Sequence, residues 1–173
     1  MPLRAPKISI EVSMNTYISK AMYVETIHKA KLGALRQLSI YADNKVGKLH
    51  EITRLLASQG LHIMAISVLD NTDSAMIRMV VNYTGKAIEV LTANKFTFGV
   101  VEVLGLEIQS EAYINKALAT LTEAEINIDY VYPFLMRPEG RSGLVLRLED
   151  IELASAILSQ RGFTVLDESD IAR

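Results

Sequence analysis

The segment with the clearest chemical potential is a polar loop, residues 43–49, with the sequence Asp-Asn-Lys-Val-Gly-Lys-Leu. Apolar periodicity places it between a strand and the first turn of a helix, where free backbone amides and the helix dipole attract a carboxylate or phosphate. Gly47 would let a ligand approach the backbone closely, and Asp43 or Asn44 could receive an ammonium group. The loop therefore suits an α-amino acid, although the same residues also fit a plain helix cap and turn.

The residues around this loop predict a β-α-β-β-α-β unit. Leu38, Ile40 and Ala42 alternate with polar residues, as in a strand with one buried face. Gly60 stands where a left-handed residue would end the first helix. This order is typical of an α+β, ferredoxin-like fold with an antiparallel sheet and both helices on one face. The expected elements are a strand at 37–42, a helix at 49–56, a hairpin at 61–69 and 76–81, a helix at 84–94 and a strand at 96–104.

The second half of the chain repeats this unit. A shift of 65 residues places Leu49 on Ile114 and Leu56 on Leu121, and a shift of 67 residues places Leu91 on Leu158. The change in shift falls at a longer hairpin loop, residues 137–141. Self-similarity at a fixed period indicates duplicated structural units, so we expect two units whose sheets lie on one side while four helices cover the other.

The repeat sets the domain boundaries. We expect a first domain at residues 35–104 and a second at 105–173, preceded by an N-terminal arm at 1–34. Residues 97–108 must serve as the last strand of the first domain and the first strand of the second, so the two should be rigidly joined. The arm carries patterns of a short strand and a helix, and it either docks as extra elements or stays partly disordered.

The loop pattern Asp-x-x-x-Gly-x-Leu, followed by Gly60-Leu61-His62-Ile63 at the second strand, resembles the ACT domain family within this duplicated unit. The resemblance covers roughly residues 35–171 and is closest to small bacterial proteins made of two tandem ACT domains. It implies a non-catalytic regulatory sensor that holds an amino acid between paired ACT domains. The ligand-binding residues it implies are Asp43, Asn44, Val46, Gly47, Lys48 and Leu49 in the loop, and His62, Ile63 and Met64 on the strand.

The corresponding loop of the second repeat departs from the family pattern. It reads Ser-Glu-Ala-Tyr-Ile at residues 110–114, where the family often has Pro-Gly, and it contains no glycine. We therefore expect it to bind a ligand poorly. Asn127 at the second strand of this repeat could still offer its amide to a ligand shared across the repeats. One class of site per chain is the expectation.

Composition excludes several classes of function. The 173 residues contain no cysteine and carry a formal net charge of −2 without a basic patch, so disulfides, thiolate chemistry and nucleic-acid binding are not expected. No apolar stretch is long enough to cross a bilayer, and we expect a cytoplasmic protein without a membrane partner. The three histidines, His28, His50 and His62, do not stand at metal-ligand spacing, so neither a metal nor a cofactor is expected.

Two functions other than a sensor come into consideration, an interaction-only subunit and a phosphatase. An interaction-only subunit that docks on an amino-acid metabolic enzyme is the alternative, and in either case exposed strands and one open sheet face predict a homodimer. The same unit occurs in small phosphatases, but the first loop offers no arginine for phosphate, and no nucleophile and base appear together.

Three aromatic residues, Tyr130, Tyr132 and Phe134, share one strand face. Packing explains them as well as a functional role does, and that role would be a ligand-pocket wall or a dimer contact. Met64, Met76 and Met79 also lie on expected strands, where we expect them to fill the core.

Overall fold

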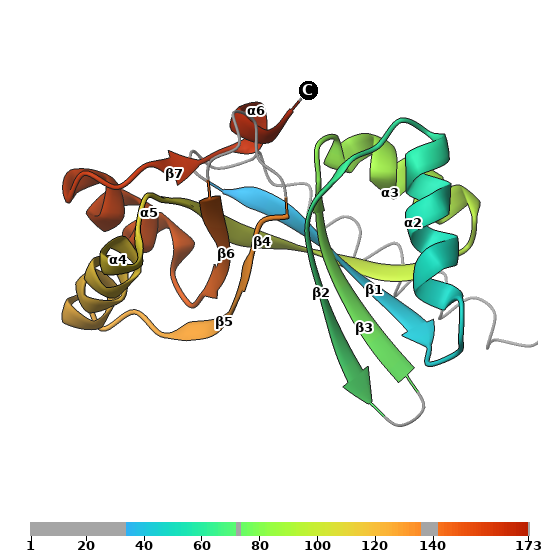
Figure 1. The fold of residues 1–173 in the computed structure, drawn as a ribbon, viewed down its shortest axis with the longest axis horizontal. Coiled ribbons are helices and arrows are strands. Elements are labelled where there is room, and N and C mark those ends of the chain that lie inside the picture. Colours follow the sequence, from blue (N-terminus) through green and yellow to red (C-terminus); the bar gives the residue numbers. More distant parts are fainter. Residues whose placement is uncertain (1–33, 72–73, 136–141, 173) are drawn as a thin grey trace, which may run out of the picture.

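The computed structural model describes residues 34–71, 74–135 and 142–172. The strand and helix expected in the N-terminal arm, and the longer hairpin loop at 137–141, lie outside the described residues. Within the described part, the helices and strands follow the order expected from the sequence (Figure 1).

The first unit is an antiparallel sheet covered by two helices. Its strand order is β2-β3-β1-β4, and every neighbouring pair is antiparallel. This arrangement confirms the ferredoxin-like α+β fold for the first half of the chain. Its elements are β1 (Leu35–Asp43), α2 (Lys48–Ser58), β2 (Ile63–Asn71), β3 (Ser74–Val81), α3 (Thr84–Ala93) and β4 (Thr97–Ile108).

The second unit repeats the architecture and uses β4 as its own first strand. Strand β6 pairs with β4 and β5, and β7 pairs with β4, which gives the order β5-β6-β4-β7. This order matches that of the first unit position by position, so the duplication expected from the sequence is confirmed. The further elements are α4 (Glu111–Glu123), β5 (Ile128–Pro133), β6 (Ser142–Leu148), α5 (Ile151–Gln160), β7 (Val165–Leu166) and α6 (Glu168–Ile171).

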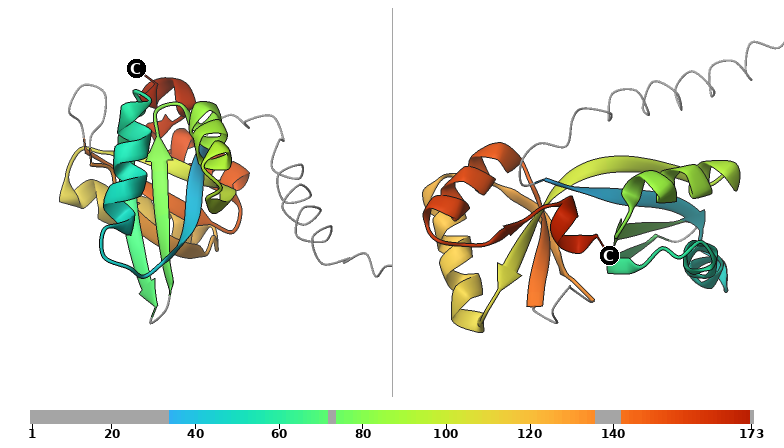
Figure 2. Two further views of the ribbon diagram at one scale, coloured as in Figure 1. Left: turned by 90° about the vertical axis from the view of Figure 1, so that its right-hand side faces the viewer. Right: turned by 90° about the horizontal axis from the view of Figure 1, so that it is seen from above.

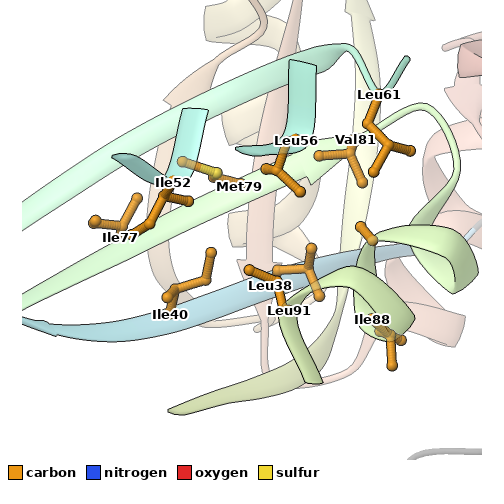
Figure 3. Close-up of a cluster of buried hydrophobic side chains, with 11 residues drawn as sticks. Leu38, Ile40, Ile52, Leu56, Leu61, Ile77, Met79, Val81, Ile88 and Leu91 are labelled. Atoms are coloured by element: carbon orange, nitrogen blue, oxygen red, sulfur yellow. The ribbon is translucent and has the colours of Figure 1, made fainter. Parts of the chain in front are cut away.

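Each unit encloses its own core between helices and sheet. In the first unit, Ile52 and Leu56 project from α2 toward Ile77, Met79 and Val81 of β3, in one cluster with Leu38 and Ile40 of β1 (Figure 3). The core of the second unit uses the repeat-related positions, with Leu121 in place of Leu56 and Leu158 in place of Leu91. The apolar spacing of the helices therefore predicts both cores correctly. Met79 lies in the first core as expected, whereas Met76 is only partly buried.

Strand β4 joins the two units without a linker. Its first half, Thr97–Val103, pairs with β1, and its second half, Leu104–Ile108, pairs with β6. The double role expected for residues 97–108 is confirmed. As a result, seven strands form one continuous hydrogen-bonded sheet.

The helix-free faces of the two units pack against each other. Leu35 of β1, Val80 of β3, Tyr132 of β5 and Val145 of β6 form a third buried cluster that contains residues of both units. Figures 1 and 2 show α2 and α3 on one side of the strands and α4 and α5 on the opposite side. All four helices therefore lie on one face of the continuous sheet, as expected. They stand on opposite sides of the molecule because the long sheet bends at β4 and buries its helix-free face against itself.

A polar cluster lies inside this third core. Gln37 is fully buried, and its amide donates to the Tyr130 hydroxyl and to Ser39 Oγ, at 2.9 Å each. The Tyr132 hydroxyl donates to Gln37 Oε1 over 2.8 Å. Burial raises the pKa of the Tyr132 phenol well above its ordinary value, so this hydroxyl remains a donor. Of the three roles weighed for the tyrosines, packing between the units is the one they have here.

We predict that Gly105→Ala destabilises the protein. A Cβ at position 105 would lie 2.7 Å from Leu35 Cδ1 and 3.0 Å from Leu166 Cβ, so a methyl group would crowd the point where the units join. Overpacking of this kind costs about 1–3 kcal/mol, measurable by urea denaturation. Gly85→Ala in α3 is the control, because its Cβ meets no atom within 4 Å; equal stability of the two variants would contradict the packing described.

We also predict that Gln37→Leu destabilises the fold by roughly 1–3 kcal/mol, because the buried Tyr132 hydroxyl loses its acceptor. The double variant with Tyr132→Phe should recover part of that loss, since it removes the stranded hydroxyl. Chemical denaturation of the wild type, both single variants and the double variant measures this coupling. If the losses in the free energy of unfolding of the two single variants add up to that of the double variant, Gln37 and Tyr132 are not coupled, and the cluster does not join the units.

Candidate ligand-binding site

The loop between β1 and α2 is held by its own backbone. The Lys45 amide donates to the Asp43 carbonyl at 2.8 Å, and the Lys48 amide donates to the Lys45 carbonyl at 3.2 Å. Gly47 is the N-cap residue, with φ at 88° in the left-handed region that favours glycine. Because glycine has no side chain, this residue cannot cap the first-turn amides of α2.

The charges of the loop are paired and exposed. Lys45 Nζ lies 2.9 Å from Asp43 Oδ2, with both side chains largely in solvent. This hydrogen bond and the charge of Lys45 hold the pKa of Asp43 below its ordinary value, so the carboxylate remains ionised at neutral pH. An ammonium group could share this exposed carboxylate with Lys45.

The start of α2 carries a second ion pair. Lys48 Nζ lies 2.9 Å from Glu51 Oε2 and 5.2 Å from the centre of the Phe96 ring. Val46 and Leu49 beside it are exposed. Small-molecule sites usually combine apolar side chains with a few polar groups such as backbone donors, and this loop offers both.

The start of β2 has little free backbone. His62 donates its amide to Asn82 Oδ1 at 2.9 Å and accepts at its carbonyl from the Asn82 amide at 3.1 Å. The Met64 carbonyl accepts from the Leu135 amide at 2.8 Å, and the Met64 side chain is buried in the third core. A ligand at this edge would therefore meet few free backbone groups at His62 and Met64.

A pocket of about 480 Å³ lies between α2 and the start of β2. It brings three of the expected residues, His62, Ile63 and Met64, together. The six expected loop residues do not line it, although Leu49 directly precedes the lining residue His50. The helix side of the pocket, which was not expected from the sequence, consists of His50, Thr53, Arg54 and Ala57.

Those four residues recur at positions i, i+3, i+4 and i+7, which form one stripe of a helix. The stripe could have been found in the sequence as the surface beside the buried positions Ile52 and Leu56. The sequence did not show that the connection from α2 to β2 brings Leu61 and His62 alongside this stripe.

Asn127 is not brought to this pocket. It lies between α4 and β5, and its carbonyl accepts from the Glu149 amide at 3.2 Å. Figure 1 shows α4 and α2 on opposite sides of the strands. Within one chain, a ligand beside α2 therefore does not reach Asn127.

The loop before α4 differs from its counterpart before α2. Ser110 at the N-cap is extended, with φ at −162°. Tyr113 stands where the first unit has Lys48; its ring packs edge-on against Phe163, with 4.9 Å between ring centres, and its hydroxyl donates to the Gly162 carbonyl. The second loop thus lacks both the glycine and the positive charge that favour an anion in the first loop.

The described residues give no support to a metal site or to a membrane-spanning helix. They contain no group of three or more His, Asp or Glu side chains that could hold a metal ion. In the same part of the chain, none of the helices has the length and apolar character needed to cross a membrane. His28 lies outside the described residues.

The comparisons with known proteins agree with this architecture. Protein BT0572 from Bacteroides thetaiotaomicron is similar over 81% of this chain and 96% of its own, with 26% identity and a TM-score of 0.73. The regulatory subunit of aspartate kinase from Thermus thermophilus, in a ligand-free form, is similar over 75% and 93%, with 15% identity and a TM-score of 0.50; at that identity it shows the fold alone. No curated protein matches the sequence significantly.

The family described as "ACT domain pair" matches residues 33–173. This match spans both repeats and confirms the resemblance seen in the loop and strand pattern. The chain therefore belongs to the ACT domain pair family.

Proposed function

We propose that this protein is a non-catalytic regulatory sensor whose first unit binds an amino acid. The observation that carries the proposal is the start of α2, where Gly47 leaves the first-turn amides without a side-chain cap beside an open pocket. Such a helix start attracts a carboxylate. Asp43 or Asn44 in the same loop would receive the ammonium group, and His62, Ile63 and Met64 would line the far wall.

The proposed site includes all six loop residues. Val46 and Leu49 would cover the ligand with apolar surface, while Lys48 would add positive charge near its carboxylate. The second unit lacks this combination, because Ala112 and Tyr113 replace Gly47 and Lys48. One site per chain is therefore the expected stoichiometry.

We further propose that the ligand lies between two copies of the chain. The helix-free faces of both units are buried against each other within one chain, so the α2 surface is left facing outward. A second chain would close the pocket and bring its own Asn127 near the ligand. Val68, Leu69 and Leu135, which are exposed on and beside the edge strands, offer apolar area for such an assembly.

The same exposed residues favour the alternative function, in which the protein acts only by docking on an amino-acid metabolic enzyme. An interaction-only subunit would need the apolar surface but not the open loop at Gly47. Ligand binding by the isolated protein separates the two functions.

The sensor proposal predicts that an amino acid stabilises the isolated protein. At a ligand concentration about a hundred times the dissociation constant, binding should add roughly 2.7 kcal/mol, which corresponds to a melting rise of about 5–10 °C. A thermal-shift screen of the common amino acids measures this effect. If none raises the melting temperature, the interaction-only function is favoured.

The variant Gly47→Val should abolish that ligand-induced shift, because a branched side chain disfavours φ of 88° and blocks approach to the amides. Gly162→Val is the matched control: it has φ of 82° and open space around it, but lies in the second unit. Both variants should lose stability, and only Gly47→Val should lose the response. Glu111→Ala and Ala112→Val, in the loop of the second repeat, should leave the response intact.

The dimer proposal predicts a species of about 38 kDa, twice the 19.2 kDa of one chain, at micromolar concentration. Light scattering coupled to gel filtration measures this mass directly. Leu69→Lys and Leu135→Lys should lower the mass toward that of one chain if the edge strands form the contact. A single-chain mass for the wild type, with and without the stabilising amino acid, would contradict the proposal.

A further inference from the structure

The pocket beside α2 has an uneven distribution of charge. Its eight lining residues include Arg54, His50 and His62 but no acidic residue. The histidines carry no negative charge in either protonation state. A pocket with this lining disfavours a cation and favours a ligand with negative charge.

Arg54 is the strongest anion-binding group in this lining. Within the described residues its guanidinium has no ion pair or side-chain hydrogen bond, whereas Lys45, Lys48 and Arg161 are each paired with a carboxylate. A guanidinium presents five donors in a planar fork that matches a carboxylate. Arg54 therefore offers an open position for a carboxylate inside the pocket.

The opposite wall suits an aliphatic chain. Leu61 and Ile63 line the pocket on the β2 side, and Ala57 adds apolar surface next to Arg54 on α2; Met64 also lines the pocket, although its side chain is buried in the third core. Methylene groups that pass over this wall would leave water, which favours binding. A ligand that combines methylene groups with a terminal carboxylate would satisfy both walls.

We infer that the ligand of this pocket is a dicarboxylic amino acid whose side-chain carboxylate binds Arg54. The inference rests on the proposed function, which places the α-carboxylate at the first turn of α2. Arg54 lies four residues beyond His50, which corresponds to about 6 Å along a helix axis at 1.5 Å per residue. Two carboxylates joined by a short methylene chain, as in glutamate or aspartate, span a distance of this order.

Isothermal titration calorimetry with L-glutamate, L-aspartate, L-glutamine and L-lysine tests the inference. We expect one of the two acidic amino acids to bind at least tenfold more tightly than glutamine, and lysine to bind most weakly. Arg54→Gln should weaken binding of the acidic ligand about tenfold or more, because a hydrogen-bonded charge pair contributes that much, and should leave glutamine binding unchanged.

Arg161→Gln is the control, since it removes a surface charge of the same sign from the second unit. Equal weakening by Arg54→Gln and Arg161→Gln would overturn the inference, because it would reveal only a general effect of charge. Binding of neutral amino acids as tightly as acidic ones would overturn it too, while the proposed function would stand. Absence of binding by every common amino acid would overturn both.

Discussion

The continuity of strand β4 is the constraint on which the rest of the structure depends. One strand of 12 residues completes the sheet of the first unit and begins that of the second, so the units cannot move apart as independent domains. The sheet bends at this strand, and Gly105 lies against Leu35 and Leu166 where the units meet. The helix-free faces then close on each other around Gln37 and the two tyrosines.

This internal closure determines which surfaces are left for function. A sheet face that is buried within the chain cannot serve a ligand or a second copy, so binding falls to the helices and the edge strands. The two helical sides are not equivalent, because the first has Gly47 and Lys48 where the second has Ala112 and Tyr113. Duplication has thus kept the packing positions of both units, while the glycine and the lysine at the helix start are present only in the first.

The sequence predicted the parts that follow from local periodicity. The buried stripe of α2, the left-handed glycine at its end and the shared strand at 97–108 all have signatures within a few residues. The packing of the two helix-free faces against each other was not predicted from the sequence, because it depends on how far the sheet bends at β4. The helix wall of the pocket was missed for a related reason: Arg54 acquires its neighbours Leu61 and Ile63 only when α2 packs beside β2.

The central claim is that the α2 side of the first unit holds the ligand. Backbone amide shifts in a ¹⁵N-labelled sample, recorded while L-glutamate is added, test it most directly. We expect saturable changes at residues 43–50 and 61–64, with residues 108–115 of the second loop unaffected. Changes confined to the second unit, or to the tyrosine cluster between the sheets, would contradict it.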